Sequence, residues 1–397
     1  MESELFDILI VYTEKLATSA STLKNGVLLP FAKGSNSESY NVVYGYFLEI
    51  CQKNGLKAAF TTSADIIGAG RCQSYWLYEG NSWVKVRKTG YSKVIFDKFS
   101  PVNEKIKDNR SLLFSSKKIK PFNQPFLFDL FFDKQKTYKK LHQFSIPTVS
   151  IKKNTLKSVN SACKTLEQIK SNHPHREDFS DEIIMKNRFG AGGINVYKFR
   201  VGQIREMVKS LKKHNKKSFV IQSFVSFDQG FSYKNSPVST DIRIIYLRGK
   251  IIQTYIRMAK AGDFRCNEHQ GATLKYIPIS QVPTDVLLAS NKIAEVLNKR
   301  SLFLRNNKSS LFALDFIISN NGNIYLLEGN TGPGLDWNLS SKENKKEAQK
   351  FIRIVVKELA KLARQTKTSK KEFENVVVGT SATYSPVPDI FILRVTP

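Results

Sequence analysis

The sequence predicts an α+β protein in which a small α/β unit precedes a larger region of paired strands and packed helices. Three observations support this prediction. The chain has 397 residues, which is more than one ordinary hydrophobic core holds. Strand-like runs alternate with helical periodicity as far as about residue 120. Beyond that point several apolar strand-like runs follow one another with turn signals between them.

The N-terminal unit is predicted from short local patterns. The apolar run Phe6–Tyr12 predicts a β-strand, and Lys57–Thr61 and Val94–Phe96 predict two more. Residues 40–54 have helical periodicity, and Gly55 follows as a stop signal. The inward face of this predicted helix holds four residues: Val43, Phe47, Ile50 and Cys51.

The middle of the chain begins with the aromatic-rich stretch Phe122–Phe132, for which a buried connector is favoured over a binding platform. Helices are predicted for Asp133–Phe144 and Thr155–Ser171. The second helix has four residues on its inward face: Leu156, Val159, Leu166 and Ile169. The predicted strands of this region are Ile146–Val149, Ile183–Lys186, Ile194–Phe199 and Phe219–Val225.

The last third of the chain combines strands with two helices. The predicted strands are Arg243–Leu247, Ile251–Met258, Leu311–Ile318 and Ile324–Leu327. An Asn-Gly pair within residues 320–323 predicts that the last two strands form a hairpin. The predicted helices are Val286–Lys299 and Glu347–Arg364, and the polar tail from Thr366 has no assigned structure.

The bulk composition excludes several classes of protein. Hydrophobic residues make up 41% and charged residues 24%, as in soluble globular chains. No stretch is long and apolar enough to cross a bilayer, and the N-terminus lacks the pattern of a signal peptide. The four cysteines form no CxxC pair, which argues against a zinc site or a disulfide scaffold. The expected location is the cytoplasm.

The net charge of +28 has two interpretations. It can attract a polyanion such as RNA, a ribosomal surface or an acidic polypeptide. It can also come from a Lys/Asn-rich composition spread over solvated faces. The basic residues are diffuse along the chain, which favours the second interpretation.

The first chemical motif is an apolar strand that ends in Lys186 and continues into a glycine-rich turn with Gly190, Gly192 and Gly193. An ammonium group and exposed backbone N–H groups can hold phosphate together. The spacing is not that of a P-loop. A simple glycine turn in a β-hairpin is the structural alternative.

The second motif places Asp315, Glu328 and Asn330 on the two strands of the predicted hairpin, before a Gly-Pro-Gly turn. Two carboxylates and an amide oxygen at the ends of paired strands suit Mg²⁺ shared with substrate phosphates. The alternative is two solvated acids at the end of a hairpin. Arg257 and Arg265 lie between the two motifs and can clamp a phosphoryl group or a carboxylate.

The order of these motifs resembles that of ATP-grasp ligases of the RimK type, to which glutathione synthetase is more distantly related. The resemblance covers roughly residues 125–365. It is carried by the run Asp241-Ile242-Arg243, by Arg257, by Gly262-Asp263-Phe264-Arg265-Cys266-Asn267 and by Glu328-Gly329-Asn330 with the following Pro-Gly. RimK-type enzymes attach glutamate to a ribosomal protein.

The resemblance implies a role for each matching residue. Lys134 and Lys186 would contact the ATP phosphates under a glycine flap, and Asp241 would lie near the nucleotide. The residues that would meet adenine are Gln222, Ser223, Phe224 and Val225, with Ser223 where the family usually has Glu. The residues that would contact phosphate or the acyl-phosphate are Arg257, Arg265 and Asn267. The residues that would hold Mg²⁺, or Mn²⁺ in its place, are Asp315, Glu328 and Asn330.

The resemblance also implies an ATP-grasp fold, in which two α+β subdomains clasp ATP behind a small α/β domain. The expected domains are residues 1–120, a central subdomain at 121–218, a C-terminal subdomain at 219–365 and a tail at 366–397. A carboxylate substrate would attack the γ-phosphate of ATP, and an amine would then attack the acyl-phosphate.

The partners implied are a carboxylate and an amine, with an acidic peptide or protein among the acceptors and homo-oligomers open. An ATP-grasp scaffold that binds RNA or a ribosome without ligase turnover is the alternative. The intact set of Asp315, Glu328 and Asn330 argues against it. No membrane partner is expected.

Overall fold

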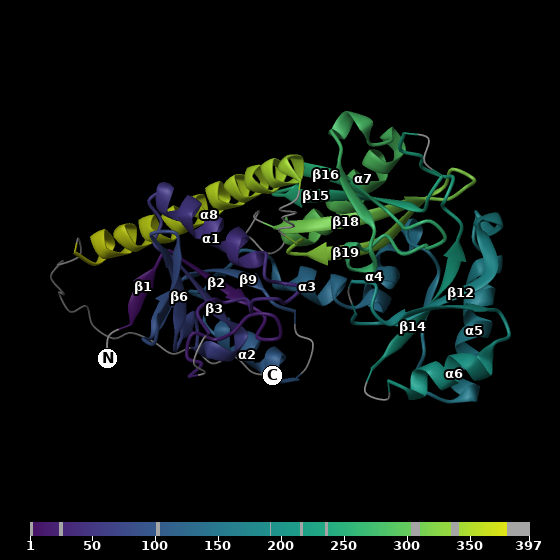
Figure 1. Ribbon diagram of the computed structural model, residues 1–397, viewed down its shortest axis with the longest axis horizontal. Coiled ribbons are helices and arrows are strands. Elements are labelled where there is room, and N and C mark those ends of the chain that lie inside the picture. Colours follow the sequence, from purple (N-terminus) through teal and green to yellow (C-terminus); the bar gives the residue numbers. More distant parts are fainter. Residues whose placement is uncertain are drawn as a thin grey trace, which may run out of the picture.

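The structure is a computed structural model, and it describes residues 3–23, 27–100, 104–190, 192–214, 217–234, 237–302, 310–334 and 341–378. Helices make up 35% and strands 30% of the chain, which confirms the α+β prediction. The described residues form four sheets. Figure 1 shows the N-terminal unit at one end, the central sheet at the other end and the C-terminal sheet between them.

The N-terminal unit is built on a six-stranded sheet. In spatial order its strands are β10 (Lys120–Pro121), β9 (Val94–Lys98), β2 (Ile8–Tyr12), β3 (Ala58–Thr62), β6 (Tyr75–Glu79) and β7 (Ser82–Val86). The first four are parallel to one another, and β6 and β7 are antiparallel to their neighbours. The packed helices are α1 (Tyr40–Lys53) and α2 (Glu104–Leu113). The predicted inward face of α1 is confirmed, because all four of its residues are buried.

The run Phe6–Tyr12 is not one strand. Phe6 belongs to β1 (Glu4–Phe6), and the chain bends at Asp7, whose N–H bonds to the carbonyl of Lys57 before β2 begins. Strand β1 joins a small sheet with β8 (Gly90–Ser92), β5 (Arg71–Cys72) and β4 (Ile66–Gly68). None of these three partners was predicted, because each is at most three residues long.

The central sheet is antiparallel. Its strands lie in the order β11 (Thr148–Ser150), β14 (Phe219–Val225), β12 (Phe179–Asn187) and β13 (Val196–Arg200). Helices α5 (Leu156–Ser171) and α6 (Ile204–Lys212) pack on it through Val159, Leu166 and Met207. The inward placement of Leu156 was wrong, since this first residue of α5 is 52% exposed.

The connector between the N-terminal unit and the central sheet is buried, as predicted. It forms α3 (Pro125–Phe131), whose Phe128 and Phe131 are almost fully covered. Asp133 then caps α4 (Lys134–Leu141) by accepting hydrogen bonds from two backbone N–H groups.

The C-terminal sheet has five antiparallel strands covered on both faces. They lie in the order β17 (Thr273–Tyr276), β16 (Lys250–Met258), β15 (Thr240–Leu247), β18 (Leu311–Ile318) and β19 (Ile324–Thr331). Helix α7 (Thr284–Leu302) packs on the face that includes Ile244. Helix α8 (Lys342–Val378) packs on the face that includes Ile245. The predicted hairpin of β18 and β19 is confirmed.

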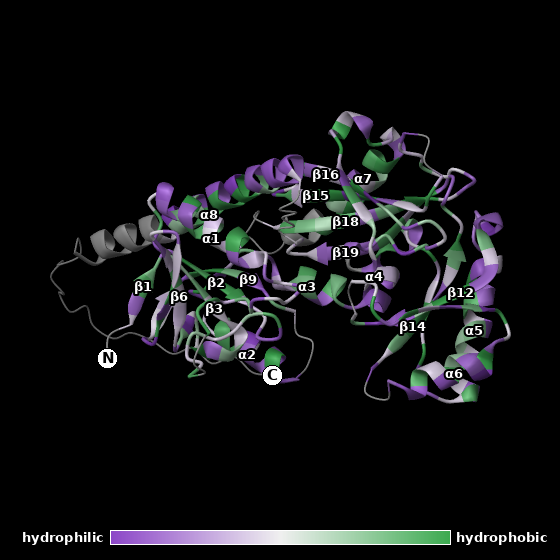
Figure 2. Ribbon diagram, viewed as in Figure 1, coloured by the Kyte–Doolittle hydropathy of each residue, from purple (hydrophilic) through white to green (hydrophobic). Residues whose placement is uncertain are grey.

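Helix α8 joins the N-terminal unit to the C-terminal sheet. It shares one hydrophobic core with the C-terminal sheet and with α1 and β2 of the N-terminal unit, as Figure 1 shows. The predicted helix Glu347–Arg364 was too short at both ends, and residues 366–378 of the predicted tail continue it. The rest of that tail, residues 379–397, lies outside the described residues. Figure 2 shows hydrophobic residues gathered along the strands.

Five 3₁₀ helices complete the described elements. They are η1 (Ser63–Asp65), η2 (His142–Phe144), η3 (Arg176–Asp178), η4 (Glu268–Gln270) and η5 (Ile279–Gln281). The four cysteines are free thiols. Within the described part of the chain, no helix is both long and apolar enough to span a membrane.

Candidate active site

A cavity lies where the central and C-terminal sheets meet. Strands β12 and β14 form one wall, and the ends of β15, β16, β18 and β19 form the other. All predicted nucleotide-binding and catalytic residues line it: Lys134, Lys186, Gly190, Gly192, Gly193, Gln222, Ser223, Phe224, Val225, Asp241, Arg257, Arg265 and Asn267. Glu328 lines it as well, whereas Asp315 and Asn330 do not border it.

Lys186 stands at the end of β12 and is buried, with 9% of its surface exposed. Its Nζ donates a hydrogen bond to Oε1 of Gln222 on β14 at 2.8 Å. Burial lowers the pKa of Lys186 to about 8, helped by the charge of Lys134 and opposed by Glu328. The cavity therefore holds a poorly solvated ammonium group, whose charge a phosphate group would compensate.

Lys134 is the first residue of α4 and faces the same end of the cavity. Its Nζ donates to the carbonyl of Gly190 and lies 3.6 Å from Oε1 of Glu328. The preceding Asp133 accepts two hydrogen bonds from Arg188, at 2.7 and 2.6 Å. This pair was not predicted from the sequence, although an Asp before a predicted helix is a capping signal. The ion pair of Asp133 and Arg188 links the start of α4 to the loop after β12.

The glycine-rich loop between β12 and β13 reaches across the cavity to the opposite subdomain. Gly192 and Gly193 both have left-handed φ angles, +69° and +70°. A Cβ at Gly193 would stand 2.7 Å from Oδ1 of Asn267. Nε2 of Gln270 also donates to the carbonyl of Gly192 at 3.4 Å. The loop therefore rests on the segment that follows β16.

The other end of the cavity is apolar. Val225, Phe227 and Ile317 belong to one buried cluster that borders it, together with Phe264 and Leu327. Phe224 packs edge-on against Phe264, with ring centroids 5.7 Å apart. Such walls suit the flat face of a base. The Ser223 hydroxyl is buried and has no hydrogen-bond partner among the described residues.

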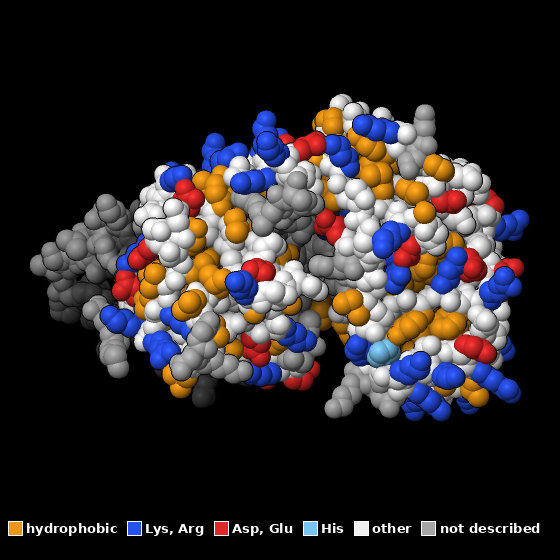
Figure 3. Space-filling model, in the orientation of Figure 1, with side chains coloured by type: hydrophobic (Ala, Val, Ile, Leu, Met, Phe, Trp, Pro, Cys, Tyr) orange, Lys and Arg blue, Asp and Glu red, His pale blue; other side chains and the backbone are white. Residues whose placement is uncertain are grey.

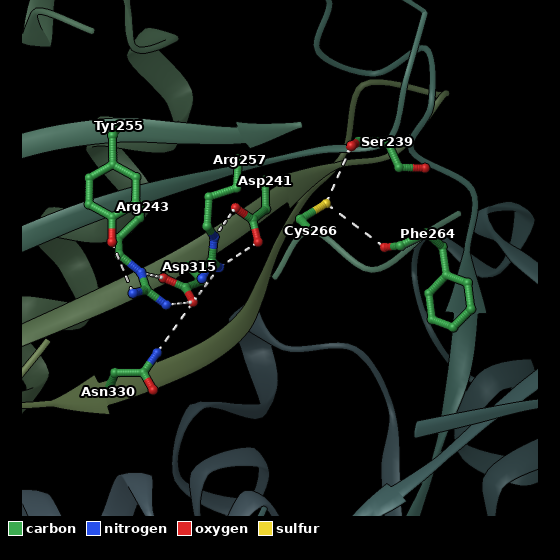
Figure 4. A network of polar contacts seen from close by, with 9 residues as sticks. All are labelled: Ser239, Asp241, Arg243, Tyr255, Arg257, Phe264, Cys266, Asp315 and Asn330. Atoms are coloured by element: carbon green, nitrogen blue, oxygen red, sulfur yellow. Dashed lines mark hydrogen bonds and ion pairs between the residues drawn. The ribbon is translucent and has the colours of Figure 1, made fainter. Parts of the chain in front are cut away.

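A buried network of charged side chains lies beside this cavity (Figure 4), and two of its members, Asp241 and Arg257, line the cavity. Arg257 makes two hydrogen bonds to Asp241, at 2.8 and 2.5 Å, and a third to Asp315 at 2.8 Å. Arg243 makes two bonds to Asp315, both 2.6 Å, and one to the Tyr255 hydroxyl. No role for Arg243 was predicted from the sequence.

The carboxylates of this network differ in their pKa values. Burial raises the pKa of Asp241 to about 6, against the lowering effect of Arg257. Burial also acts on Asp315, but Arg243 and Arg257 outweigh it and leave the pKa of Asp315 below its ordinary value. Asp315 is therefore the ionised centre that compensates two buried guanidinium groups.

Cys266 and Arg265 lie together in the loop after β16. The Cys266 thiol is buried, and its Sγ lies 3.3 Å from the carbonyl oxygen of Ser239. Burial raises the pKa of Cys266, so this thiol is a poor nucleophile. Arg265 is paired with Asp263 in the same loop, at 2.8 Å, and lines the cavity.

The three residues predicted to hold a divalent cation lie on β18 and β19. Asp315 and Glu328 are cross-strand partners, and Nδ2 of Asn330 lies 3.2 Å from Oδ2 of Asp315. These oxygen-bearing groups fit a magnesium-type ion. Asp315 is only 1% exposed and bound to two arginines, so it would have to release one of them to bind the ion.

The comparisons with known proteins agree with this geometry. The model of the RimK-like ATP-grasp domain matches residues 132–355. A protein of Coxiella burnetii named probable alpha-L-glutamate ligase is 27% identical over 154 residues. That match covers 39% of this chain and 44% of the relative, so the chain spans less than half of that protein.

Two solved structures show the fold over most of the chain. D-alanyl-alanine synthetase A of Vibrio cholerae has a TM-score of 0.55 at 13% identity, covering 91% of this chain and 99% of its own. D-cycloserine synthetase has a TM-score of 0.53 at 12% identity, covering 88% and 99%. The fold predicted from the sequence is confirmed by these neighbours.

Proposed function

Because the chain belongs to the RimK-like ATP-grasp family, we propose that it is an ATP-dependent carboxylate–amine ligase. One observation carries the proposal. Lys134, Lys186 and Glu328 meet at one end of a cavity whose other end is apolar. A nucleoside triphosphate has the matching halves, a flat base and a polyanion.

The phosphates would lie at the end of the cavity that holds the two lysines. Lys186 is fixed by Gln222, and Lys134 by the Gly190 carbonyl. Both ammonium groups can therefore meet the anion with little reorganisation. The glycine loop covers this end, where it would keep water from the acyl-phosphate. The base would lie against the wall of β14 and the apolar cluster.

The reaction would proceed in two steps. The carboxylate oxygen of the substrate attacks the γ-phosphorus, ADP leaves, and an acyl-phosphate forms. The amine then attacks the acyl carbon, phosphate leaves, and the amine loses a proton. Arg265 and Asn267 border the cavity and would contact the transferring group. A divalent ion held by Glu328, Asn330 and Asp315 would offset phosphate charge when bound.

The proposal extends to the chemical class of the two substrates. We infer an amino acid such as glutamate as the amine and a peptide or protein as an acceptor. The name of the Coxiella relative and the basic charge of the chain both favour this class. A growing acidic product would be attracted to a basic protein.

The test is ADP release with Mg-ATP, single amino acids and peptide acceptors, in the parent chain and in two variants. Lys186→Ala and Glu328→Gln are each expected to lower turnover by about 100-fold or more. Two exposed control sites match the changes in type: Lys164→Ala and Glu295→Gln. They are expected to leave turnover unchanged. Full turnover in the Lys186 and Glu328 variants would show that this cavity is not the active site.

A further inference from the structure

A chain of buried hydrogen bonds leads from Lys186 to the edge of the central sheet. The Lys186 ammonium donates to Oε1 of Gln222 at 2.8 Å, and Nε2 of Gln222 donates to the Thr148 hydroxyl at 2.9 Å. The Thr148 hydroxyl donates in turn to the carbonyl of Ile146, also at 2.8 Å. Lys186, Gln222 and Thr148 are only 9%, 5% and 3% exposed, so water competes little for these bonds.

The strand register brings the three side chains together. Thr148 on β11 and Gln222 on β14 are cross-strand partners, and Gln222 is also the partner of Ile184 on β12. Lys186 lies two residues after Ile184 on the same strand. Cross-strand partners share one face of a sheet, and so do residues two apart along a strand. Thr148, Gln222 and Lys186 therefore all lie on one face of the central sheet.

The end of the chain of bonds fixes the direction of every bond in it. A carbonyl oxygen only accepts, so the Thr148 hydroxyl donates its one hydrogen to Ile146. The hydroxyl oxygen can then only accept, and Gln222 must turn its NH₂ group toward it. The amide oxygen of Gln222 is thereby left facing Lys186, whose ammonium only donates. Thr148 thus decides which end of the Gln222 amide meets the lysine.

The same strand holds the start of α4, which carries the second lysine of the cavity. The Thr148 carbonyl accepts a hydrogen bond from Nε2 of Gln135 at 3.2 Å, and the Ser150 hydroxyl donates to Oε1 of Gln135 at 2.8 Å. Gln135 directly follows Lys134 in the first turn of α4. Strand β11 is at the edge of the central sheet, so its outer side is open to such a partner. Both lysines are therefore connected to β11.

Thr148 itself stands back from the cavity of the candidate active site. The described residues that line this cavity include Lys134, Lys186 and Gln222, but not Thr148. Thr148 instead borders a smaller hollow that both lysines also line. An effect of Thr148 on a bound phosphate would therefore pass through another side chain.

We propose that Thr148 is a positioning residue of the phosphate site. It fixes the orientation of the Gln222 amide, and the amide holds the Lys186 ammonium in place with its other N–H groups left for phosphate oxygens. The inference rests on the proposed nucleotide site of the ligase. It adds a residue that lies outside the motifs from which that site was predicted.

The test is calorimetric binding of Mg-ADP to the full chain at neutral pH. Thr148→Val replaces the hydroxyl by a methyl group and leaves the buried NH₂ group of Gln222 without an acceptor. The amide would then turn away, and Lys186 would lose its fixed partner. We expect the Kd for Mg-ADP to rise about fivefold or more, the scale of one lost hydrogen bond. Thr148→Ser keeps the hydroxyl and is expected to bind within about twofold of the parent chain.

A double-mutant cycle tests whether Thr148 acts through Gln222. Gln222→Met keeps the length of the side chain without its amide, and it is expected to weaken Mg-ADP by about fivefold or more as well. In that background Thr148→Val has no amide to orient, so it should add less than about a twofold loss. Thr148→Ala also lacks the hydroxyl and gives a second measure in the same cycle. Losses that add in the double variants would overturn the inference.

Thr254→Val is the matched control. The Thr254 hydroxyl donates to the Ile277 carbonyl at 2.6 Å, and Thr254 is 5% exposed, so it resembles Thr148 in burial and in its bond to a carbonyl. It is not among the described residues that line the cavity of the candidate active site. Its Kd for Mg-ADP is expected to equal that of the parent chain. Equal weakening in Thr148→Val and Thr254→Val would mean that any lost buried hydroxyl loosens the site, which contradicts the inference.

The parent chain separates this inference from the function on which it rests. A parent chain that does not bind Mg-ADP overturns the proposed nucleotide site, and this inference with it. A parent chain that binds Mg-ADP as tightly as Thr148→Val does overturns the positioning role alone.

Discussion

At the scale of single residues, the proposed phosphate contact of the buried Lys186 predicts that nucleotide binding depends on pH. Its pKa is about 8 in the structure, so the ammonium loses its proton as pH rises through that value. Phosphate binding favours the charged form and would raise this pKa. Affinity for Mg-ADP is therefore expected to be full below pH 8 and to fall by up to about tenfold per pH unit above it.

The measurement is calorimetry at pH 8.5 in buffers of different ionisation enthalpy. Binding is expected to take up a fraction of one proton. The variant Lys186→Met keeps the length of the side chain but cannot titrate, so its proton uptake should vanish. An unchanged uptake in that variant would assign the proton to another group.

Asp315 has a stabilising role that was not expected from its position on the hairpin predicted to bind metal. It compensates Arg243 and Arg257, all three being largely buried. Asp315→Asn would leave two buried guanidinium groups short of one negative charge, so we expect it to cost about 3–5 kcal/mol of unfolding free energy.

Glu328→Gln is the matched change on the neighbouring strand. The Glu328 side chain is 22% exposed, and its ion pair with Lys134 is long, at 3.6 Å. We therefore expect Glu328→Gln to cost less than about 1 kcal/mol of unfolding free energy. Urea unfolding without nucleotide or metal measures both values. Equal losses of unfolding free energy in the two variants would contradict the stabilising role assigned to Asp315.

At the scale of elements, the glycine loop between β12 and β13 depends on the close approach of Gly193 to Asn267. In Gly193→Ala, the added methyl group would stand 2.7 Å from Oδ1 of Asn267 at a φ of +70°. The loop or the Asn267 side chain would have to move, and their contact would be lost. The expected result is a KM for ATP raised about tenfold, which corresponds to about 1.4 kcal/mol of lost binding.

The control for this substitution is Gly202→Ala. Gly202 also has a left-handed φ, +95°, but a methyl group there would meet nothing within 4 Å. It carries the same kind of backbone strain, about 1 kcal/mol, without the collision. Its KM for ATP is therefore expected to stay near that of the parent chain. A similar KM in both alanine variants would mean that strain, and not contact with Asn267, sets the effect.

At the scale of the whole molecule, Asp178 connects the central and C-terminal subdomains. It precedes β12 and accepts hydrogen bonds from Asn321, Asn323 and Tyr325 of the β18–β19 hairpin, at 2.9, 2.9 and 2.5 Å. Burial acts on its carboxyl group, but these donors outweigh it and lower its pKa. The stabilisation is thus present above the pKa of an unfolded Asp and is lost as pH falls through the lowered value.

Asp178→Asn is expected to cost about 1–3 kcal/mol of unfolding free energy at neutral pH, because a buried charged acceptor is lost. The loss should shrink toward acidic pH, where the parent carboxyl group is protonated. Asp181→Asn is the control, since the Asp181 side chain is 97% exposed. A loss that does not change with pH would show that the charge of Asp178 is not what joins the subdomains.

The charge of the whole chain has no single location on the face drawn in Figure 3. Lysine and arginine side chains are spread over that face, with acidic and apolar groups among them. This distribution agrees with the diffuse basic pattern of the sequence. The spread of basic charge on this face favours general attraction of polyanions over recognition by one binding patch.

Sequence patterns predicted most of the elements and most of the wall of the cavity. Lys186 ends an apolar strand, the glycines follow at once, and these local signals were sufficient to place them in the structure. Short strands such as β5 were missed, because two residues carry no periodicity. Helix α8 was predicted too short, because its basic residues beyond Arg364 give no inward pattern to read.

By itself, the sequence determined the α+β class, the family and the residue types around the candidate active site, since each depends on local periodicity or on a short motif. Tertiary structure decided which charges meet. Arg243 faces Asp315, and Asp241 faces Arg257, only because β15 pairs with β18 on one side and β16 on the other. The register between distant strands depends on how whole faces pack against α7 and α8, and no local pattern encodes that choice.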